Sequence, residues 1–175
     1  MMLRAALFVG LVVAGTVING AWLSRLPLPA SPDLVLLVVL AAAMRRGVET
    51  GVLMGAAAGY LRDLVGGSPL GLFTVAYLAL GAAAGATVTL VDLQQRHMPA
   101  VTAALGTALL YAASGLMVAL TGLADVQWAT LAFDAAVAAL LNAALARPVD
   151  ALVGWADGLP QRRYAARAVG LRGLR

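Results

Sequence analysis

The stretch GVLMGAAAGYLRDLVGG, residues 51–67, decides how this chain folds. Small residues recur at every fourth position, and an aspartate continues the series: Gly47, Gly51, Gly55, Gly59 and Asp63. Residues four apart lie on one face of a helix. Glycine weakens a helix, so a ridge of four indicates that another backbone approaches closely. Gly81 and Gly85 repeat the spacing once. We expect this ridge to pack within the chain in preference to packing on another protein's helix.

The composition predicts an integral membrane protein. Of 175 residues, 62% are hydrophobic and only 11% are charged, whereas about a quarter of the residues of a soluble domain are charged. The chain has no cysteine, and His97 is its single histidine. Disulfides and thiolate metal sites are therefore excluded, and we expect no metal or other cofactor.

Six apolar segments are long enough, or nearly so, to be transmembrane helices, and the fold class is all-α. They cover residues 5–22, 32–46, 47–65, 71–90, 99–121 and 128–152. Ser31 is the expected N-cap of the second helix, with Pro32 at its first position and Asp33 near its positive end. This helix is only about 21 Å long. It therefore either crosses a locally thinned bilayer or begins below the surface.

The arginines predict the orientation. With the amino terminus inside, ten of the twelve basic residues fall in inner segments, and only Arg25 and Arg62 fall outside. We expect both termini to be cytoplasmic, with a transmembrane domain over residues 1–155 and a basic cytoplasmic tail over residues 156–175. The charge of the tail favours attraction to anionic lipid. The alternative is a docking peptide for a cytoplasmic partner.

Arg62 and Asp63 are adjacent charges near the outer end of the third helix. Neighbouring side chains on a helix point about 100° apart, so these two cannot pair well with each other. Asp134 in the sixth helix lies at a similar level. We predict that Arg62 pairs with Asp134, and that Asp63 accepts hydrogen bonds from polar groups around the start of the second helix.

A ligand pocket is the alternative interpretation of these charges, because intramembrane charges often mark functional sites. The candidates form an outer-leaflet polar cluster: Asp33, Arg62, Asp63 and Asp134, with Asn19 and Asn142 as further polar residues. No nucleophile–base pair, phosphate-binding loop or catalytic carboxylate pair is present. We expect neither enzymatic activity nor nucleic-acid binding.

One region resembles a known family. Pro32-Asp33 is followed by the glycine ridge with Tyr60, Leu61 and Asp63, then by Pro69-Leu70-Gly71, and then by Gly81 and Gly85. This order resembles the bacterial rod-shape-determining membrane protein MreD over about residues 32–85. Arg62 departs from the family pattern, in which an apolar residue is expected before the aspartate. By position, the signature residues of the family are Asp33, Gly55, Gly59, Asp63 and Gly71.

The resemblance implies a non-enzymatic scaffold of the cell-elongation machinery in the bacterial inner membrane. Its partners would be the bitopic protein MreC and, through MreC, the actin-like MreB, the glycosyltransferase RodA and a class B penicillin-binding protein. The helices of this family also look like the substrate-binding subunit of energy-coupling-factor transporters. The alternative function is therefore a small-molecule-binding membrane component of a transporter.

Overall fold

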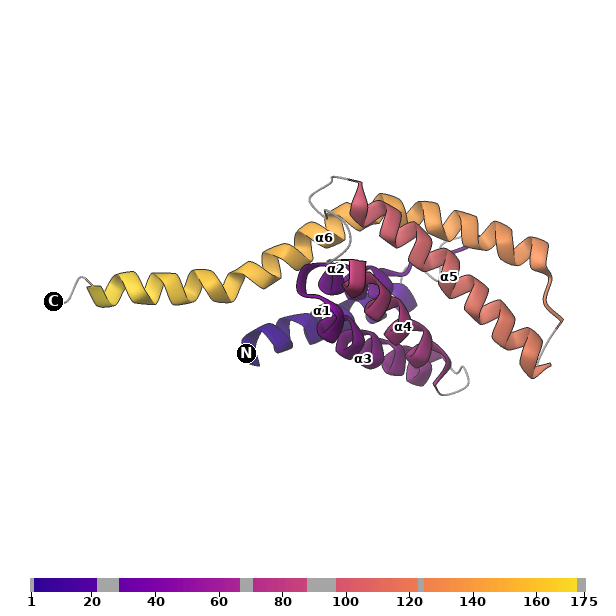
Figure 1. The fold of residues 1–175 in the computed structure, drawn as a ribbon, viewed down its shortest axis with the longest axis horizontal. Coiled ribbons are helices and arrows are strands. Elements are labelled where there is room, and N and C mark those ends of the chain that lie inside the picture. The colour runs from indigo at the N-terminus through magenta and orange to yellow at the C-terminus, as the bar shows by residue number, and fades with distance from the viewer. Residues whose placement is uncertain (1, 22–28, 67–70, 88–96, 123–124, 173–175) are drawn as a thin grey trace.

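The computed structural model describes residues 2–21, 29–66, 71–87, 97–122 and 125–172, and these residues form an all-α fold (Figure 1). Its helices are α1 (Met2–Ala21), α2 (Leu34–Arg46), α3 (Val48–Gly66), α4 (Leu72–Ala86), α5 (Met98–Thr121) and α6 (Trp128–Arg172). Two of the predicted boundaries, Trp22 and Leu90, lie outside the described residues. The sixth helix is longer than predicted, because it continues through Pro160 to Arg172.

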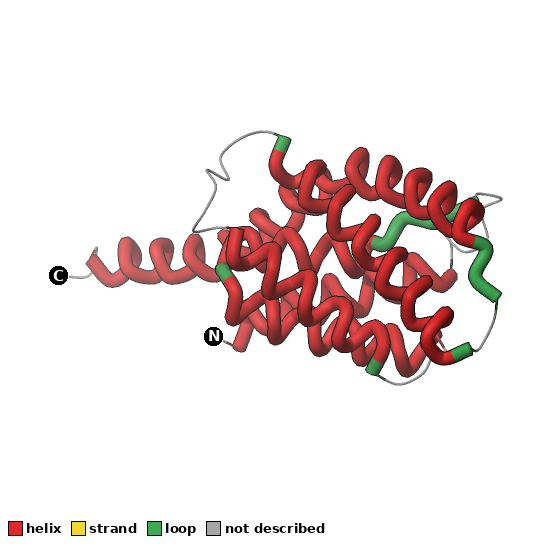
Figure 2. The backbone as a smooth tube through the Cα atoms, turned by 45° about the vertical axis from the view of Figure 1, so that its right-hand side comes forward, coloured by secondary structure: helices red, strands yellow, loops and turns green. Residues whose placement is uncertain are grey.

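Helix α2 is the centre of the fold. It contacts each of the other five helices, and every residue from Val35 to Met44 is buried. The hairpins α3–α4 and α5–α6 both pack against it, and α1 packs against α2 and α6. Both views show the start of α1 and the far end of α6 toward the same end of the bundle (Figures 1 and 2).

The burial of α2 explains how so short a helix fits the fold. Its 13 residues span only about 20 Å, well below the thickness of a hydrocarbon core. Because α2 is surrounded by other helices, its ends contact protein groups and not lipid. Its length therefore does not have to match the thickness of the bilayer. Asp33, and not the predicted Ser31, is the N-cap: its carboxylate accepts a hydrogen bond of 3.1 Å from the backbone N–H of Leu36.

The glycine ridge of α3 faces α4, where the two backbones approach too closely for side chains between them. A Cβ added to Gly55 would lie 2.9 Å from the Cα of Leu78, and one added to Gly59 would lie 2.7 Å from the carbonyl carbon of Phe73. Real Cβ atoms essentially never come within 3.0 Å of such atoms. Gly51 and Gly81 touch each other through their backbones. The four-residue spacing therefore gives α3 and α4 a glycine seam.

Gly47, Gly71 and Gly85 complete the predicted set. A Cβ on Gly85 would lie 2.6 Å from the backbone of Gly47 and Val48, so the seam extends to the start of α3. Gly47 and Gly71 have φ angles of +87° and +100°, a region that side chains disfavour. Each stands next to a helix end, where the positive φ turns the chain.

Large apolar side chains cover much of the outside. Among the described residues, two helical stretches are long and apolar enough to cross a membrane, Met98–Thr121 and Trp128–Gly158. Leu7–Ala21 and Leu72–Ala86 are apolar but shorter. Leu105, Leu120 and Leu140 are each at least 60% exposed, which suits a surface whose solvent is lipid.

Candidate functional site

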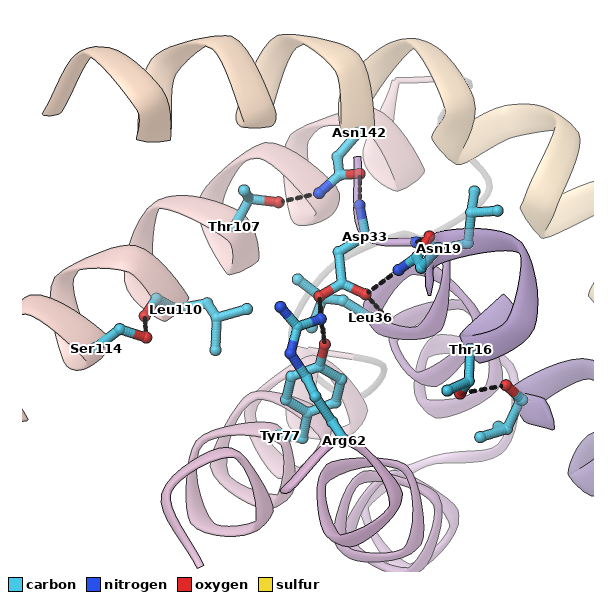
Figure 3. A network of polar contacts seen from close by, with 12 residues as sticks. Thr16, Asn19, Asp33, Leu36, Arg62, Tyr77, Thr107, Leu110, Ser114 and Asn142 are labelled. Atoms are coloured by element: carbon cyan, nitrogen blue, oxygen red, sulfur yellow. Dashed lines mark hydrogen bonds and ion pairs between the residues drawn. The ribbon is translucent and has the colours of Figure 1, made fainter. Parts of the chain in front are cut away.

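A cluster of polar side chains surrounds the start of α2 (Figure 3). We call it the Asp33 cluster, and its members are Asn19, Asp33, Arg62, Tyr77, Thr107 and Asn142. Asp33, Tyr77, Thr107 and Asn142 are all buried. The six residues come from six different elements, so the cluster joins every helix of the bundle.

The carboxylate of Asp33 is the hub of the cluster, and both of its oxygens have two donors. Oδ1 accepts from the backbone N–H of Leu36 at 3.1 Å and from Asn19 Nδ2 at 3.3 Å. Oδ2 accepts from Nη1 of Arg62, with which it forms an ion pair, and from the hydroxyl of Tyr77. A buried carboxylate is tolerated when it is paired and hydrogen-bonded in this way.

Asn142 connects α2 to the α5–α6 hairpin. Its Oδ1 accepts from the backbone N–H of Asp33 at 2.8 Å, and its Nδ2 donates to Thr107 Oγ1 at 2.7 Å. Thr107 in turn donates to the carbonyl of Ala103 at 2.7 Å. Because these groups are buried, each would be costly to leave unpaired, and the network fixes how the helices meet.

A cavity of about 590 Å³ adjoins the cluster. Asn19, Asp33, Arg62, Thr107 and Asn142 contribute to its wall, together with Tyr111 and Ser114 of α5. Val35, Val65, Leu110, Leu131 and Ala138 form much of the apolar part of the wall. Asp63 and Asp134, which were predicted as pocket residues, are not among the described residues that line it.

Asp63 serves the start of α4. It is 2% exposed and accepts hydrogen bonds from the backbone N–H groups of Gly71 (2.9 Å), Phe73 (3.0 Å) and Thr74 (3.1 Å). The hydroxyl of Thr74 donates a further bond of 2.7 Å. A carboxylate at this position satisfies orphan amides and complements the helix dipole.

Two predicted pairings are therefore wrong. Arg62 pairs with Asp33 and not with Asp134. Asp63 caps α4, and the hydrogen bonds that it accepts from Gly71, Phe73 and Thr74 all come from the start of α4, where donors around the start of α2 were expected. Both errors have one cause: a position along a helix gives the depth of a residue, but not which neighbouring helix its side chain meets. Asp134 lies close enough to Tyr111 to interact with it electrostatically.

Comparison with known proteins places this geometry in a family. The family model described as "rod shape-determining protein MreD" matches residues 2–153. The chain belongs to the MreD family. The match covers all of α1–α5, most of α6, the glycine seam and the whole Asp33 cluster. No curated protein and no solved structure matches the chain.

This MreD-family chain has a second set of charges, at the other end of α2. Arg45 binds Asp150 through two hydrogen bonds, of 2.8 Å from Nε and 2.7 Å from Nη2. Arg46 forms an ion pair with Asp157 and stacks on the ring of Phe8, with 5.0 Å from Cζ to the ring centroid. These pairs fasten the end of α2 to α6. The sequence interpretation used these arginines only for orientation and missed their partners.

The sequence interpretation also missed Tyr77 and Thr107. Tyr77 stands four residues before Gly81 in a largely apolar helix, and this four-residue spacing from the glycines could have identified it. Thr107 carries no such signal, because threonines are common in apolar helices and most bond their own backbone. The described residues contain no group of three or more His, Cys, Asp or Glu side chains that could hold a metal ion.

Proposed function

We propose that this chain is a non-enzymatic membrane scaffold of the bacterial cell-elongation complex, which binds MreC and supports lateral peptidoglycan synthesis. The observation that carries the proposal is the match of 152 consecutive residues, 2–153, to a family whose role is rod-shape determination. Through MreC the scaffold would connect to MreB, RodA and a class B penicillin-binding protein.

The proposed topology has six membrane-crossing helices with both termini in the cytoplasm of a bacterium, as a multi-pass protein of the inner membrane. Residues 1–155 would form the transmembrane domain, and residues 156–175 the basic tail. An even number of helices with both chain ends toward one end of the bundle supports this topology (Figure 1). Arg45 and Arg46 end α2 at the predicted inner side, in agreement with the positive-inside rule.

The polar chemistry suits a scaffold better than an enzyme. In the Asp33 cluster the carboxylate of Asp33 and the amide of Asn142 are bound to other members of the cluster, which holds helices in place. The glycine seam likewise fixes α3 against α4 through backbone contact. A rigid bundle of this kind presents constant apolar faces, and a single-span partner such as MreC would pack on one of them.

Genetic replacement tests the proposal. We expect a rod-shaped bacterium depleted of its own MreD-family protein to lose its rod shape, and expression of this chain to restore it. Gly55→Leu should fail to restore rods, because the leucine side chain would force α3 away from α4. Gly10→Ala is the matched control, since nothing lies within 4 Å of the added Cβ. Membrane insertion without any rescue of shape by the unaltered chain would contradict the proposal.

A further inference from the structure

The cavity beside the Asp33 cluster has the size and lining of a ligand site. Its volume of about 590 Å³ falls within the range of about 300–1,000 Å³ that small-molecule pockets occupy. Its polar wall holds Arg62, Tyr111 and Ser114 beside other members of the Asp33 cluster, and its apolar wall is formed by residues such as Val65, Leu110 and Leu131. Such a wall suits a molecule with one polar group and an apolar body.

Arg62 presents one side of its guanidinium to this cavity. Nη1 is bound to Asp33 and Tyr77, and the plane lies over the ring of Phe73, with 4.4 Å from Cζ to the ring centroid. Among the described residues, Nε and Nη2 have no hydrogen-bond partner, and the side chain remains 36% exposed. These two nitrogens form the edge that binds carboxylate or phosphate in bidentate fashion.

The ion pair with Asp33 leaves Arg62 able to bind a second anion. Leu36, Asn19 and Tyr77 supply three other donors to the carboxylate, so Arg62 can be shared with a second anion. Tyr111 of α5 also lines the cavity and is half-buried, and its hydroxyl has no hydrogen bond to another described residue. Tyr111 is also close enough to Arg62 for the two to interact electrostatically.

We propose that this cavity binds an amphiphilic anion, whose carboxylate or phosphate is held by Nε and Nη2 of Arg62 and the hydroxyl of Tyr111. The apolar body would lie against Val65, Leu110 and Leu131. The anionic group belongs either to a lipid headgroup or to a water-soluble phosphate. Binding would lock the α3–α4 hairpin, which carries Arg62, to the α5–α6 hairpin, which carries Tyr111 and Leu131.

The test is thermal unfolding of the full chain in neutral detergent, with three probes. Dihexanoyl phosphatidylglycerol is the amphiphilic anion, dihexanoyl phosphatidylcholine has the same tails without net charge, and glycerol 1-phosphate is the headgroup alone. We expect phosphatidylglycerol to raise Tm in a saturable manner and phosphatidylcholine not to do so. An equal effect of glycerol 1-phosphate identifies a water-soluble ligand, whereas no effect identifies a lipid.

Variants distinguish binding in the cavity from binding of the anion to other basic surfaces of the protein. Ser114→Leu fills the cavity and removes only a hydroxyl that bonds the carbonyl of its own helix at Leu110. Ser114→Leu should therefore abolish the rise in Tm caused by phosphatidylglycerol. Thr121 is on the same helix and makes the same kind of backbone bond, but it lies away from the cavity. Thr121→Leu should therefore retain the rise in Tm. Arg62→Lys retains the charge but loses the two-nitrogen edge, and should weaken binding roughly tenfold.

The outcomes are decisive even if Arg62→Lys does not fold, because Ser114→Leu and Thr121→Leu leave the Asp33 cluster untouched. An anion-dependent shift that Ser114→Leu removes and Thr121→Leu retains supports the proposal. Equal shifts in the unaltered chain and Ser114→Leu would overturn it, since the anion would then bind elsewhere. Equal shifts with the two lipids would overturn it as well.

Discussion

Replacing Gly55 with alanine tests the glycine seam near its middle, between Gly51 and Gly59. The new Cβ would overlap the carbonyl oxygen of Tyr77 and lie 2.7 Å from its carbonyl carbon, whereas ordinary contact begins at 3.4 Å. The obstructing atoms are backbone, so no side chain can move aside, and α3 must shift from α4 by at least about 0.7 Å. A gap of that size forfeits about a quarter or more of each dispersion contact along the seam.

The expected cost follows from two opposing effects. Overpacking of this kind destabilises by about 1–3 kcal/mol, and alanine recovers up to about 1 kcal/mol of helix propensity. Gly55→Ala should therefore lower the free energy of unfolding by about 1–2 kcal/mol. Gly10→Ala should raise it by about 0.5–1 kcal/mol, since Gly10 is also within a helix and its Cβ meets open space.

Thermal unfolding of both variants in one detergent, followed by the loss of monodisperse protein, measures the difference. We expect Tm to fall for Gly55→Ala and to rise slightly for Gly10→Ala. If Gly55→Ala were as stable as Gly10→Ala, the two backbones could not be as close as the structure has them, and the explanation of the four-residue spacing would fail.

Three further variants test the polar contacts, each by thermal unfolding. Asp63→Asn should destabilise by about 2–4 kcal/mol, because its amide NH₂ would face N–H donors of α4; an unchanged Tm would contradict the cap. Exchange of the charges, Asp33→Arg with Arg62→Asp, should not restore the stability that each single change removes, because Asp33 also caps α2; full rescue would show that the ion pair alone matters. A double-mutant cycle of Arg45→Ala and Asp150→Ala should give a coupling of only about 0.2–1 kcal/mol, since this pair is partly exposed; several kcal/mol would mean a drier environment than the structure shows.

The parts of the fold that follow from local periodicity were predictable. The four-residue repeat of Gly51, Gly55 and Gly59 depends only on helix geometry, and it gave the correct face of α3 before the identity of the neighbour was known. The carboxyl-terminal end of α2 and both ends of α5 likewise follow from proline, glycine and charge at helix termini. The start of α2 was predicted two residues too early, because Asp33 and not Ser31 caps it. The length of α6 was not predictable in this way, because Pro160 signals a break that the helix does not make.

The site was less predictable, because its contacts depend on which helices are neighbours. Asp33, Arg62 and Asn142 were all singled out as polar residues in apolar surroundings, which the cost of burying them justifies. Their mutual contacts join residues 29 and 109 positions apart in the sequence. The depth of a residue in the membrane, estimated from its position along a helix, did not distinguish Asp134 from Asp33 as the partner of Arg62. Only the central position of α2, against all five other helices, selects Asp33.

Identification of the proteins that accompany this chain tests the central claim most directly. The tagged chain is purified from its native membrane in mild detergent, and the co-purifying proteins are quantified beside a Gly55→Leu sample. We expect an MreC protein at near-stoichiometric amount with the unaltered chain, accompanied by enzymes of wall synthesis, and its loss from Gly55→Leu. An ATPase pair with a coupling membrane subunit, and no MreC, would contradict the scaffold and make the chain a component of a transporter.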